Sequence, residues 1–382
     1  MMIMPDATLG VLGGGQLGRM FVLAAHSMGY RAWVLDPDPD SPAGSMADRH
    51  LQAAYDDADA LEEMAAGCAA VTTEFENVPA ETLEYLEARL PVRPGSKAVA
   101  IARDRIREKT FIRDLGLATA PFFAINSAAD LEPACAELTM PALLKTAQFG
   151  YDGKGQIGVD NLDQARLAFA DLNQAPCVLE ECVQLEQELS VVLARGATGQ
   201  TAVYPVGENL HVNGILDSTR VPGRVPDDVA SNACDMALQL ANAMDYCGVL
   251  AVEFFITEDG QLLINEMAPR PHNSGHYTID ACLTSQFEQQ VRTLCGLPPG
   301  STRLLSPAVM VNVLGDLWNK GTPRWQYLFA ETHTNLHLYG KEEARPGRKM
   351  GHYTCLAEDA EQAMRIAERV RAAIDPNAPE ED

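Results

Sequence analysis

The stretch from Gly260 to Tyr277, GQLLINEMAPRPHNSGHY, joins a β-strand pattern to a dense group of charged and polar side chains. A second strand pattern, VLAVEFFIT, precedes it from Val249 to Thr257, and the turn sequence EDGQ lies between the two. An Asp-Gly pair between β-branched and apolar runs is typical of a hairpin with a two-residue loop. This loop length predicts that Glu253 lies directly opposite Glu266.

Two carboxylates that face each other across a strand pair destabilise it unless a positive charge lies between them. A hard divalent cation such as Mg²⁺, held by one or two carboxylates and by phosphate oxygens, is the usual arrangement in ATP sites. The residues that follow, Arg270, His272, Asn273 and His276, indicate that such a metal site opens into an anion and substrate site. From the hairpin alone a second interpretation stays open, in which the loop length differs and one glutamate faces solvent.

A glycine-rich segment, FGYDGKGQIG from Phe149 to Gly158, follows a short apolar strand pattern at Ala142 to Lys145. Glycines let backbone N–H groups approach phosphate oxygens, and Lys145 and Lys154 would add positive charge. The segment lacks the G-x-x-x-x-G-K-[ST] pattern of a P-loop. It predicts a flap that closes over phosphates, with a polar hairpin turn as the plainer interpretation.

The N-terminal segment fits a dinucleotide-binding pattern, with the spacing G-x-G-x-x-G between two predicted strands and an acidic residue, Asp36, after the second strand. The same glycines also serve other phosphates near a helix N-terminus, or simply allow close helix–strand packing. Asp36 is followed by Pro-Asp-Pro-Asp, so we expect it in a solvated loop. The predicted elements are strands at Ala7–Leu12 and Arg31–Leu35 and a helix at Arg19–Gly29.

The composition indicates a soluble cytoplasmic enzyme. The chain has 382 residues and a net charge of −24, which argues against a nucleic-acid partner. No apolar run approaches the roughly 20 residues needed to cross a bilayer, and the N-terminus lacks the basic start of a signal peptide, so we expect no membrane partner. The nine cysteines lack C-x-x-C spacing and are expected to be buried, reduced thiols.

Basic residues gather in two places despite the overall acidity. The first cluster is spread round a predicted helix, so most of it is expected to be a solvated face, with Arg105 the best candidate for function. The second follows a strand pattern and places Arg345, Arg348 and Lys349 on a short turn, near Lys341. Paired guanidinium groups there could grip a phosphate, although ordinary surface cations remain an alternative. The first cluster consists of Lys97, Arg103, Arg105, Arg107 and Lys109.

Together these features resemble the ATP-grasp ligases, and within them the 5-(carboxyamino)imidazole ribonucleotide synthetase family of purine biosynthesis. The matching strings span nearly the whole chain, and the last two are the most specific. In many ATP-grasp enzymes a further metal ligand follows as E-x-N, whereas this chain has Ala268, which disfavours a biotin-carboxylase type of enzyme. The strings are GGGQLGRM (Gly13–Met20), the turn Glu74–Glu76, ARDRIREK (Ala102–Lys109), GYDGKGQ, NEMAPRPHNSGH (Asn265–His276) and RPGRKMGH (Arg345–His352).

The resemblance implies a set of site residues. Mg²⁺, with Mn²⁺ as an alternative ion, would be held by Glu253 and Glu266. Lys154 stands where many relatives have arginine, which weakens the case for a bidentate anion contact there. Catalytic contacts are implied for Arg270, His272, Asn273, Lys154 and Asp152, and His276 is either a base or a structural hydrogen bonder. ATP contacts are implied for Arg105, Lys145, Gly150, Tyr151, Asp152, Gly153, Lys154, Gly155, Gln156, Glu180, Glu181, Cys182, Val183, Glu188, His211, Asn265 and Glu266. Substrate contacts are implied for Gln16, Leu17, Glu74, Tyr151, Lys341, Arg345 and Arg348.

The implied fold is a mixed α/β and α+β chain: an ATP-grasp fold with a Rossmann-like N-terminal domain and a small β-rich C-terminal domain. The expected borders are 1–120 for the first domain, 121–297 for the ATP-grasp domain, with lobes at about 121–181 and 182–297, and 298–374 for the last. Residues 375–382 are expected to be a disordered tail. In the C-terminal domain, Pro307–Gly315 and Thr332–Tyr339 are the predicted strands.

The implied activity is carboxylation of 5-aminoimidazole ribonucleotide with bicarbonate and ATP by way of carboxyphosphate, in a homodimer. Another ATP-grasp carboxylase or a formyl-phosphate ligase is the nearer rival. A nicotinamide-dependent oxidoreductase would explain the N-terminal glycines but neither the acidic hairpin nor the glycine loop. A non-catalytic nucleotide sensor with this fold is a further alternative.

Overall fold

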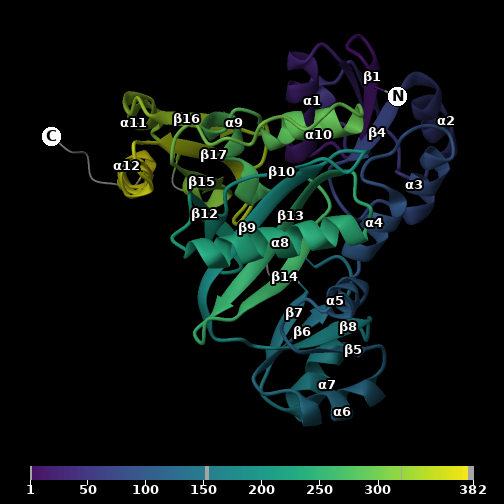
Figure 1. Cartoon of the computed structure of the whole chain (residues 1–382), viewed down its shortest axis with the longest axis vertical. Helices are drawn as coiled ribbons and strands as arrows, with labels where there is room; N and C mark the ends of the chain where they lie inside the picture. The colour runs from purple at the N-terminus through teal and green to yellow at the C-terminus, as the bar shows by residue number, and fades with distance from the viewer. Residues whose placement is uncertain (1, 151–154, 320, 377–382) are drawn as a thin grey trace.

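The structure of the protein is a computed structural model that describes residues 2–150, 155–319 and 321–376. Its N-terminal part is a parallel sheet in the order β3-β2-β1-β4, with β1 buried along its whole length, as alternating strands and helices predict. Figure 1 shows this unit in purple and blue at the upper right. Its elements are β1 (Thr8–Leu12), α1 (Gln16–Ser27), β2 (Arg31–Leu35), β3 (Arg49–Leu51), α2 (Ala58–Gly67), β4 (Ala70–Thr73) and α3 (Ala80–Glu87).

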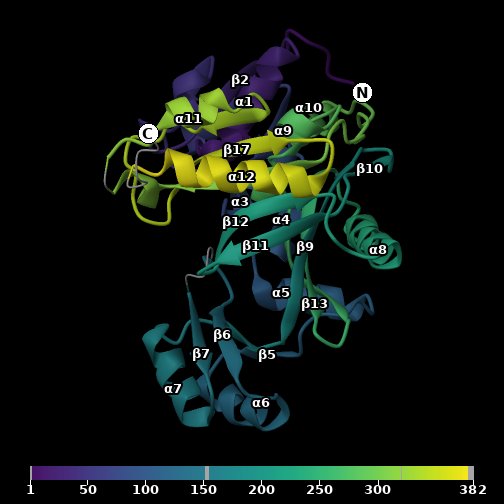
Figure 2. The ribbon, with the colours of Figure 1, turned by 90° about the vertical axis from the view of Figure 1, so that its left-hand side faces the viewer.

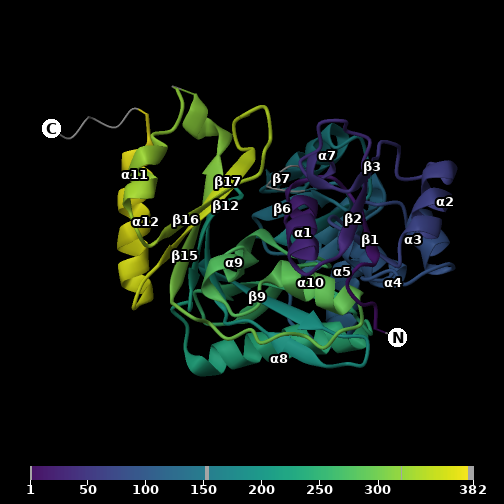
Figure 3. The ribbon, with the colours of Figure 1, turned by 90° about the horizontal axis from the view of Figure 1, so that it is seen from above.

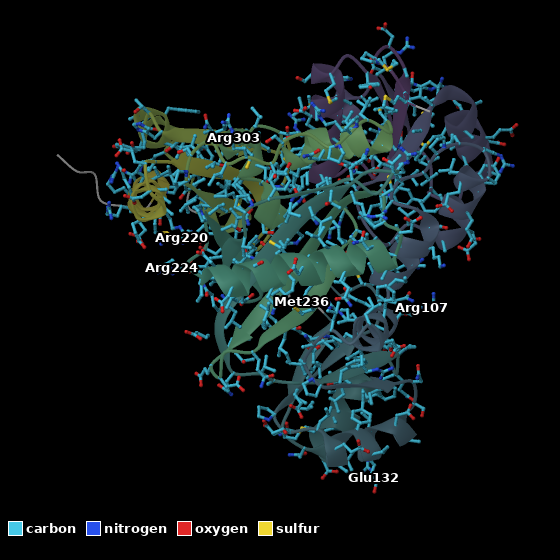
Figure 4. All side chains as sticks on the ribbon, in the orientation of Figure 1. Arg107, Glu132, Arg220, Arg224, Met236 and Arg303 are labelled. Carbon is cyan, nitrogen blue, oxygen red and sulfur yellow. The ribbon has the colours of Figure 1, made fainter. Side chains whose placement is uncertain are left out.

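Two further helices, α4 (Ser96–Ala102) and α5 (Arg105–Asp114), lead from this sheet to a small antiparallel lobe. Its strands follow the order β5-β8-β6-β7, and α6 and α7 pack on them around a separate apolar core. Figures 1 and 2 show this lobe projecting from the rest of the molecule, and Figure 4 marks Glu132 near its outer end. The elements are β5 (Phe122–Ile125), α6 (Leu131–Glu137), β6 (Ala142–Thr146), β7 (Gln156–Val159), α7 (Leu162–Asp171) and β8 (Cys177–Glu181).

The remaining strands form one large sheet in the order β14-β13-β9-β11-β12-β15-β17-β16, with β10 beside β9. The strands expected in a separate C-terminal domain continue this sheet, because Val221 of β12 pairs with Ala308 of β15. The elements are β9 (Leu185–Arg195), β10 (Thr201–Val203), β11 (Gly207–Val212), β12 (Ile215–Val221), α8 (Asp227–Ala243), β13 (Gly248–Thr257), β14 (Leu262–Ala268), α9 (Thr278–Ala281), α10 (Gln286–Leu294), β15 (Ala308–Leu314), α11 (Trp325–Ala330), β16 (Thr334–Leu338), β17 (Lys349–Leu356) and α12 (Ala360–Ile374).

Strand register determines which face of the large sheet carries the site. Leu189 and Val252 pack under α8, and Val309 packs under α12. Side chains alternate along a strand, so Glu253, next to Val252, points to the opposite face. The segment that follows β14 covers this second face through Tyr277 and Ala281. The acidic pair and the polar segment after it are therefore on the same side of the sheet.

Helix α10 connects the large sheet to the N-terminal unit. Its residues Val291 and Leu294 belong to the apolar core beneath β1 and α1. Figures 1 and 3 show α10 lying beside α1. The predicted mixed α/β fold is confirmed, and the predicted strands lie within about two residues of the observed ones. In the described part of the chain, no helix is long and apolar enough to span a membrane; of the expected tail, 377–382 lie outside the described residues.

Candidate active site

Glu253 of β13 pairs with Glu266 of β14, as the hairpin predicted. The predicted two-residue loop, however, is wrong. The N–H of Thr257 donates to the carbonyl of Gln261 at 3.0 Å, which leaves Glu258-Asp259-Gly260 as the loop. Gly260 adopts a φ of +80°, as the last position of such a loop requires.

A β-bulge at Asn265 compensates for the longer loop. Phe254 pairs with Ile264, but the next residue along β13, Glu253, pairs with Glu266, so β14 contains one additional residue. The longer loop and the additional residue in β14 therefore offset each other, and Glu253 still pairs with Glu266. The carbonyl of the additional residue, Asn265, accepts a hydrogen bond from Lys109 at 3.3 Å.

The two glutamates differ in their electrostatic surroundings. Burial and the charge of Glu266 raise the pKa of Glu253 to about 7. Burial also opposes ionisation of Glu266, but the adjacent Arg105 outweighs it and lowers the pKa of Glu266 to about 2. Arg105 Nη1 donates to Glu266 Oε2 at 2.7 Å, and His272 Nε2 lies 3.5 Å from Glu253 Oε1. Glu253 is buried and Glu266 is partly exposed. Two carboxylates with oxygens free to bind are a donor set that Mg²⁺ prefers, so these residues fit the ion.

Lys109 and Lys145 share one carboxylate, Glu180. Lys109 Nζ lies 3.0 Å from Glu180 Oε1, and Lys145 Nζ lies 3.1 Å from Glu180 Oε2. The side chain of Lys109 is fully buried, so the expected solvated face is wrong for this residue. Burial raises the pKa of Glu180, but the two lysines outweigh it and the net shift is downward. The lysines are thereby fixed near the acidic pair.

The base of the glycine loop lies next to these cations. Gln156 pairs with Lys145 across β7 and β6, and Arg105 Nη2 donates to the carbonyl of Gly150 at 3.5 Å. Gly155 adopts a φ of +73°, which favours glycine. The loop therefore emerges beside Arg105 and Lys145. The predicted contacts at Tyr151, Asp152, Gly153 and Lys154 lie outside the described residues.

The residues expected at adenine and ribose follow along β8 and β9. Glu181 Oε1 accepts the N–H of Thr139 at 2.6 Å, and the N–H of Cys182 donates to the carbonyl of Pro141 at 3.0 Å. Val183 is half-buried. Glu188 Oε2 lies 2.5 Å from His211 Nδ1.

A groove of about 400 Å³ starts at Glu188 and His211 and continues to α12. Each of its arginines is paired with a carboxylate: Arg220 with Glu361, Arg224 with Glu208, and Arg371 with Asp217. Figure 4 labels Arg220 and Arg224 on this side of the molecule. The positive charges of the groove's arginines are therefore neutralised by carboxylates of the same chain.

The polar segment after β14 is held by partners from distant parts of the chain. Arg270 donates to both carboxylate oxygens of Glu76, at 2.7 and 3.3 Å. Asn273 exchanges two hydrogen bonds with Asn312, at 2.9 and 2.7 Å. Burial and the charge of Arg270 lower the pKa of His272 to about 3, so this imidazole is neutral at physiological pH.

His276 is fully buried, and its Nδ1 lies 3.0 Å from Gln286 Nε2. Nearby, Asp280, His337 and His352 place one potential metal-ligand atom each within 4.8 Å of one another. The rings of His337 and His352 are stacked, with an interplanar angle of 17°, so their in-plane lone pairs do not converge on one ion. Asp280 bonds to His337 at 2.9 Å and Tyr339 to His352 at 2.8 Å. We interpret this cluster as a hydrogen-bonded polar core.

In the N-terminal unit, the chain's own carboxylates occupy the backbone donors of the glycine turn. Glu74 accepts hydrogen bonds from the N–H groups of Gly15 and Gly18, the latter at 2.6 Å. Asp36 accepts from Gly14 at 2.6 Å and is 8% exposed, so the expected solvated position is wrong. A dinucleotide pyrophosphate uses these same donors. In this arrangement the backbone donors of the turn are not available to a dinucleotide pyrophosphate.

The N- and C-terminal residues expected at the substrate meet at the start of α1. Lys341 Nζ donates to Gln16 Oε1 at 2.5 Å, and Leu17 packs beside Tyr339. Arg345 and Arg348, by contrast, both contact Glu343 on the exposed turn. Of the predicted substrate residues, the structure brings together Gln16, Leu17, Glu74 and Lys341.

Several partners of these side chains were not predicted from the sequence. Glu76 was part of a matched string but had no assigned role. Asn312 and Gln286 were not identified, although an amide within the apolar run AVMVNVL is a signal, because a buried polar group needs a partner. Nothing in the charged sequence around Lys109 indicates that its side chain is buried.

Three sequence-family models match the chain. They are the ribonucleotide synthetase preATP-grasp domain at residues 6–103, the ATP-grasp domain at 110–287, and the phosphoribosylaminoimidazole carboxylase C-terminal domain at 308–366. The N5-carboxyaminoimidazole ribonucleotide synthase of Bacillus subtilis is 43% identical over 360 residues, which cover 94% of each chain.

Solved structures agree with this relationship. An N5-carboxyaminoimidazole synthetase from Staphylococcus aureus, complexed with ADP, is 37% identical with a TM-score of 0.90, covering 96% of this chain and 98% of that one. An N5-carboxyaminoimidazole synthase from Aspergillus clavatus, in complex with ADP and 5-aminoimidazole ribonucleotide, is 30% identical with a TM-score of 0.87, covering 97% and 99%. The chain belongs to the N5-carboxyaminoimidazole ribonucleotide synthase family of ATP-grasp proteins.

Proposed function

We propose that this chain carboxylates 5-aminoimidazole ribonucleotide with bicarbonate and ATP, giving 5-carboxyaminoimidazole ribonucleotide, ADP and phosphate. The observation that carries the proposal is the position of Arg105, whose guanidinium contacts Glu266 of the acidic pair and Gly150 at the base of the glycine loop. Arg105 thus links the residues expected to bind the metal ion to the loop expected to bind phosphate. The identity of the substrate is inferred from the family to which the chain belongs.

The first step joins bicarbonate to the γ-phosphoryl group of ATP, and carboxyphosphate and ADP result. Arg105 and Lys145 would contact the phosphates, and Glu253 and Glu266 would hold Mg²⁺, or Mn²⁺ in its place. The chemistry that Mg²⁺ supplies in such a site is neutralisation of phosphate charge. Adenine would lie at Glu180–Val183 and ribose at Glu188, with His211 as a further nucleotide contact.

In the second step the amine of the ribonucleotide takes the carboxyl group, phosphate leaves, and the amine loses a proton. Arg270, His272 and Asn273 would direct donors at bicarbonate and carboxyphosphate. Tyr151, Asp152 and Lys154 would complete the flap and exclude water, which destroys carboxyphosphate. Gln16, Leu17, Glu74 and Lys341 would bind the ribonucleotide, with Arg345 and Arg348 turning from Glu343 to its phosphate.

We further propose that the protein works as a cytoplasmic homodimer without a nucleic-acid or membrane partner. The net charge of −24 supports the first of these exclusions. The oligomeric state is tested by light scattering of the purified chain. A monomer at assay concentrations would contradict it.

The activity is tested by measuring ADP release with Mg²⁺ and bicarbonate, with and without 5-aminoimidazole ribonucleotide. The proposal expects release to depend on the ribonucleotide. Equal rates in both reactions would remove this substrate. Dependence on biotin or on formate instead would favour another ATP-grasp carboxylase or a formyl-phosphate ligase.

A further inference from the structure

Helix α10 carries buried glutamines at Gln286, Gln289 and Gln290, which are 0%, 0% and 4% exposed. A buried amide that lacks partners is costly, so its hydrogen bonds identify what it holds. Each glutamine binds a different segment, and the three segments come from different parts of the chain. The helix also lies beside α1, as Figure 3 shows.

Gln286 forms hydrogen bonds with both backbone groups of His272, its N–H and its carbonyl. The N–H of His272 donates to Gln286 Oε1 at 2.9 Å, and Gln286 Nε2 donates to the carbonyl of His272 at 2.8 Å. The same Nε2 lies 3.0 Å from His276 Nδ1. The backbone at Gly275 lies so close that an added Cβ would be 2.5 Å from Gln286 Oε1. One side chain therefore fixes both ends of the segment His272–His276.

Gln290 holds the second support of this segment. Its Nε2 donates to Thr72 Oγ1 at 3.1 Å and to the carbonyl of Thr73 at 3.4 Å, at the end of β4. Glu76, three residues further on, is the bidentate partner of Arg270. The helix thus supports the anion residues directly at His272 and indirectly through Glu76.

Gln289 is as deeply buried as Gln286 but binds a different segment of the chain. It exchanges two hydrogen bonds of 2.8 Å with the backbone of Gly300, in the linker after α10. This linker contributes none of the proposed site residues. Gln289 is therefore a matched control for Gln286: the same helix, the same burial, and two backbone hydrogen bonds.

We propose that Gln286 is a positioning residue that sets the orientation of the His272 peptide and so aims Arg270 and His272 at the bicarbonate-derived anion. The inference rests on the proposed function for the identity of that anion. Donors aimed at developing charge lose effect when their peptide can rotate. Loss of Gln286 therefore reduces capture of carboxyphosphate more than it reduces binding of ATP.

The test compares Gln286→Met with Gln289→Met in the full chain, since methionine keeps the length of the side chain but removes its hydrogen bonds. For Gln286→Met we expect kcat/KM for bicarbonate to fall about 10- to 100-fold, as for other residues that orient ligand-binding groups. The KM for ATP stays within about twofold. More ADP than carboxylated product forms, because carboxyphosphate is lost to water. Gln289→Met loses similar thermal stability and keeps the wild-type ratio of product to ADP.

Amide hydrogen exchange provides a readout that is independent of the substrate. Exchange at the His272 N–H rises in Gln286→Met and stays at the wild-type rate in Gln289→Met. If the wild type shows no ribonucleotide-dependent ADP release, the proposed function fails, while the exchange result still decides the positioning role. Unchanged exchange at His272, or kinetics equal to those of Gln289→Met, would overturn the inference.

A second substitution approaches the same contact if Gln286→Met does not fold. Gly275→Ala places a methyl group against Gln286 Oε1 from the loop side. It should raise exchange at His272 and lower the ratio of product to ADP. Gly196→Ala is its control, because the added Cβ there would lie 3.1 Å from another glutamine oxygen, Gln200 Oε1, in a turn that holds none of the proposed site residues. Equal behaviour of the two alanine variants would overturn the inference.

Discussion

Glu253 and Glu266 are paired across the β13–β14 hairpin even though the hairpin loop is one residue longer than its Asp-Gly sequence suggests. The bulge at Asn265 restores the pairing. Both carboxylates lie on one face, and Arg105 is the cation in direct contact with Glu266. Arg105 offsets the charge of Glu266, whereas ionisation of Glu253 adds a second negative charge that a bound cation would offset, which leads to the first prediction.

Glu253→Gln should separate metal binding from folding. Removing one of two like charges should leave the thermal stability of the ligand-free protein unchanged or raised. The stabilisation by Mg²⁺ and ATP should be lost, and ADP release should fall at least about 100-fold, as for other charge-stabilising groups. Melting curves with and without Mg²⁺-ATP measure both effects. An intact shift with Mg²⁺-ATP would exclude Glu253 as a ligand.

Lys109→Met should destabilise the fold at the junction of the small lobe and the large sheet. Lys109 is fully buried and contacts Glu180, Thr119 and the carbonyl of Asn265. Removing one partner of a buried ion pair costs about 3–5 kcal/mol, and the lower end applies because Lys145 still pairs with Glu180. Chemical unfolding measures the loss. Lys97→Met, at an exposed position, is the control, and a similar stability in both variants would contradict the prediction.

Glu74→Gln should affect the ribonucleotide side of the site alone. One oxygen that accepts from Gly15 or Gly18 becomes an NH₂ group, which leaves a buried donor without an acceptor at a cost of about 1–3 kcal/mol. The KM for the ribonucleotide should rise while that for ATP stays unchanged. Initial-rate kinetics separate the two constants, with exposed Glu62→Gln as control. A thermal shift of the wild type with NAD⁺ would show instead that the glycine turn accepts a dinucleotide.

The pair Glu188–His211 should make stability depend on pH in the nucleotide-free protein. Burial alone would lower the pKa of His211, but the hydrogen bond to Glu188 and the charge of Glu253 raise it above 6.5. The folded state therefore holds the proton more tightly than the unfolded state. The contribution is complete below the unfolded pKa and disappears as pH rises through the folded pKa.

His211→Gln removes this contribution, so the wild type should exceed the variant by at most about 1 kcal/mol below about pH 6 and by less above about pH 8. Unfolding curves across this range measure the difference. A difference that grows with pH would have the wrong sign and contradict the pairing.

Much of the fold follows from local sequence. The strand, turn and glycine patterns depend on neighbouring residues, so β1, β2, β6 and the β13–β14 hairpin were predicted close to their observed positions. The acidic pair was predicted by counting back along both strands from the hairpin loop, and the prediction held despite the error in loop length because the bulge offset it. Register over a few residues is thus readable, but loop length and bulges are read less reliably.

The supports of the site could not be read in this way, because their partners are distant in sequence. Lys109 is buried by contacts to Glu180 and to Asn265, 71 and 156 residues away. Asp36 begins a proline-rich acidic segment after a strand, yet its side chain is buried and accepts a hydrogen bond from the N–H of Gly14. Gln286 resembles any helical glutamine until the peptide of His272 is placed against it. Burial of a polar side chain depends on tertiary structure that a single sequence does not display.

The most direct test of the central claim is transfer of label from ¹³C-bicarbonate to the ribonucleotide amine, followed by NMR together with ADP release. With Mg²⁺, ATP and 5-aminoimidazole ribonucleotide, a carbamate signal should appear in step with ADP. Glu266→Gln should form neither. ADP release without a labelled carbamate, or a carbamate formed without ATP, would contradict the account.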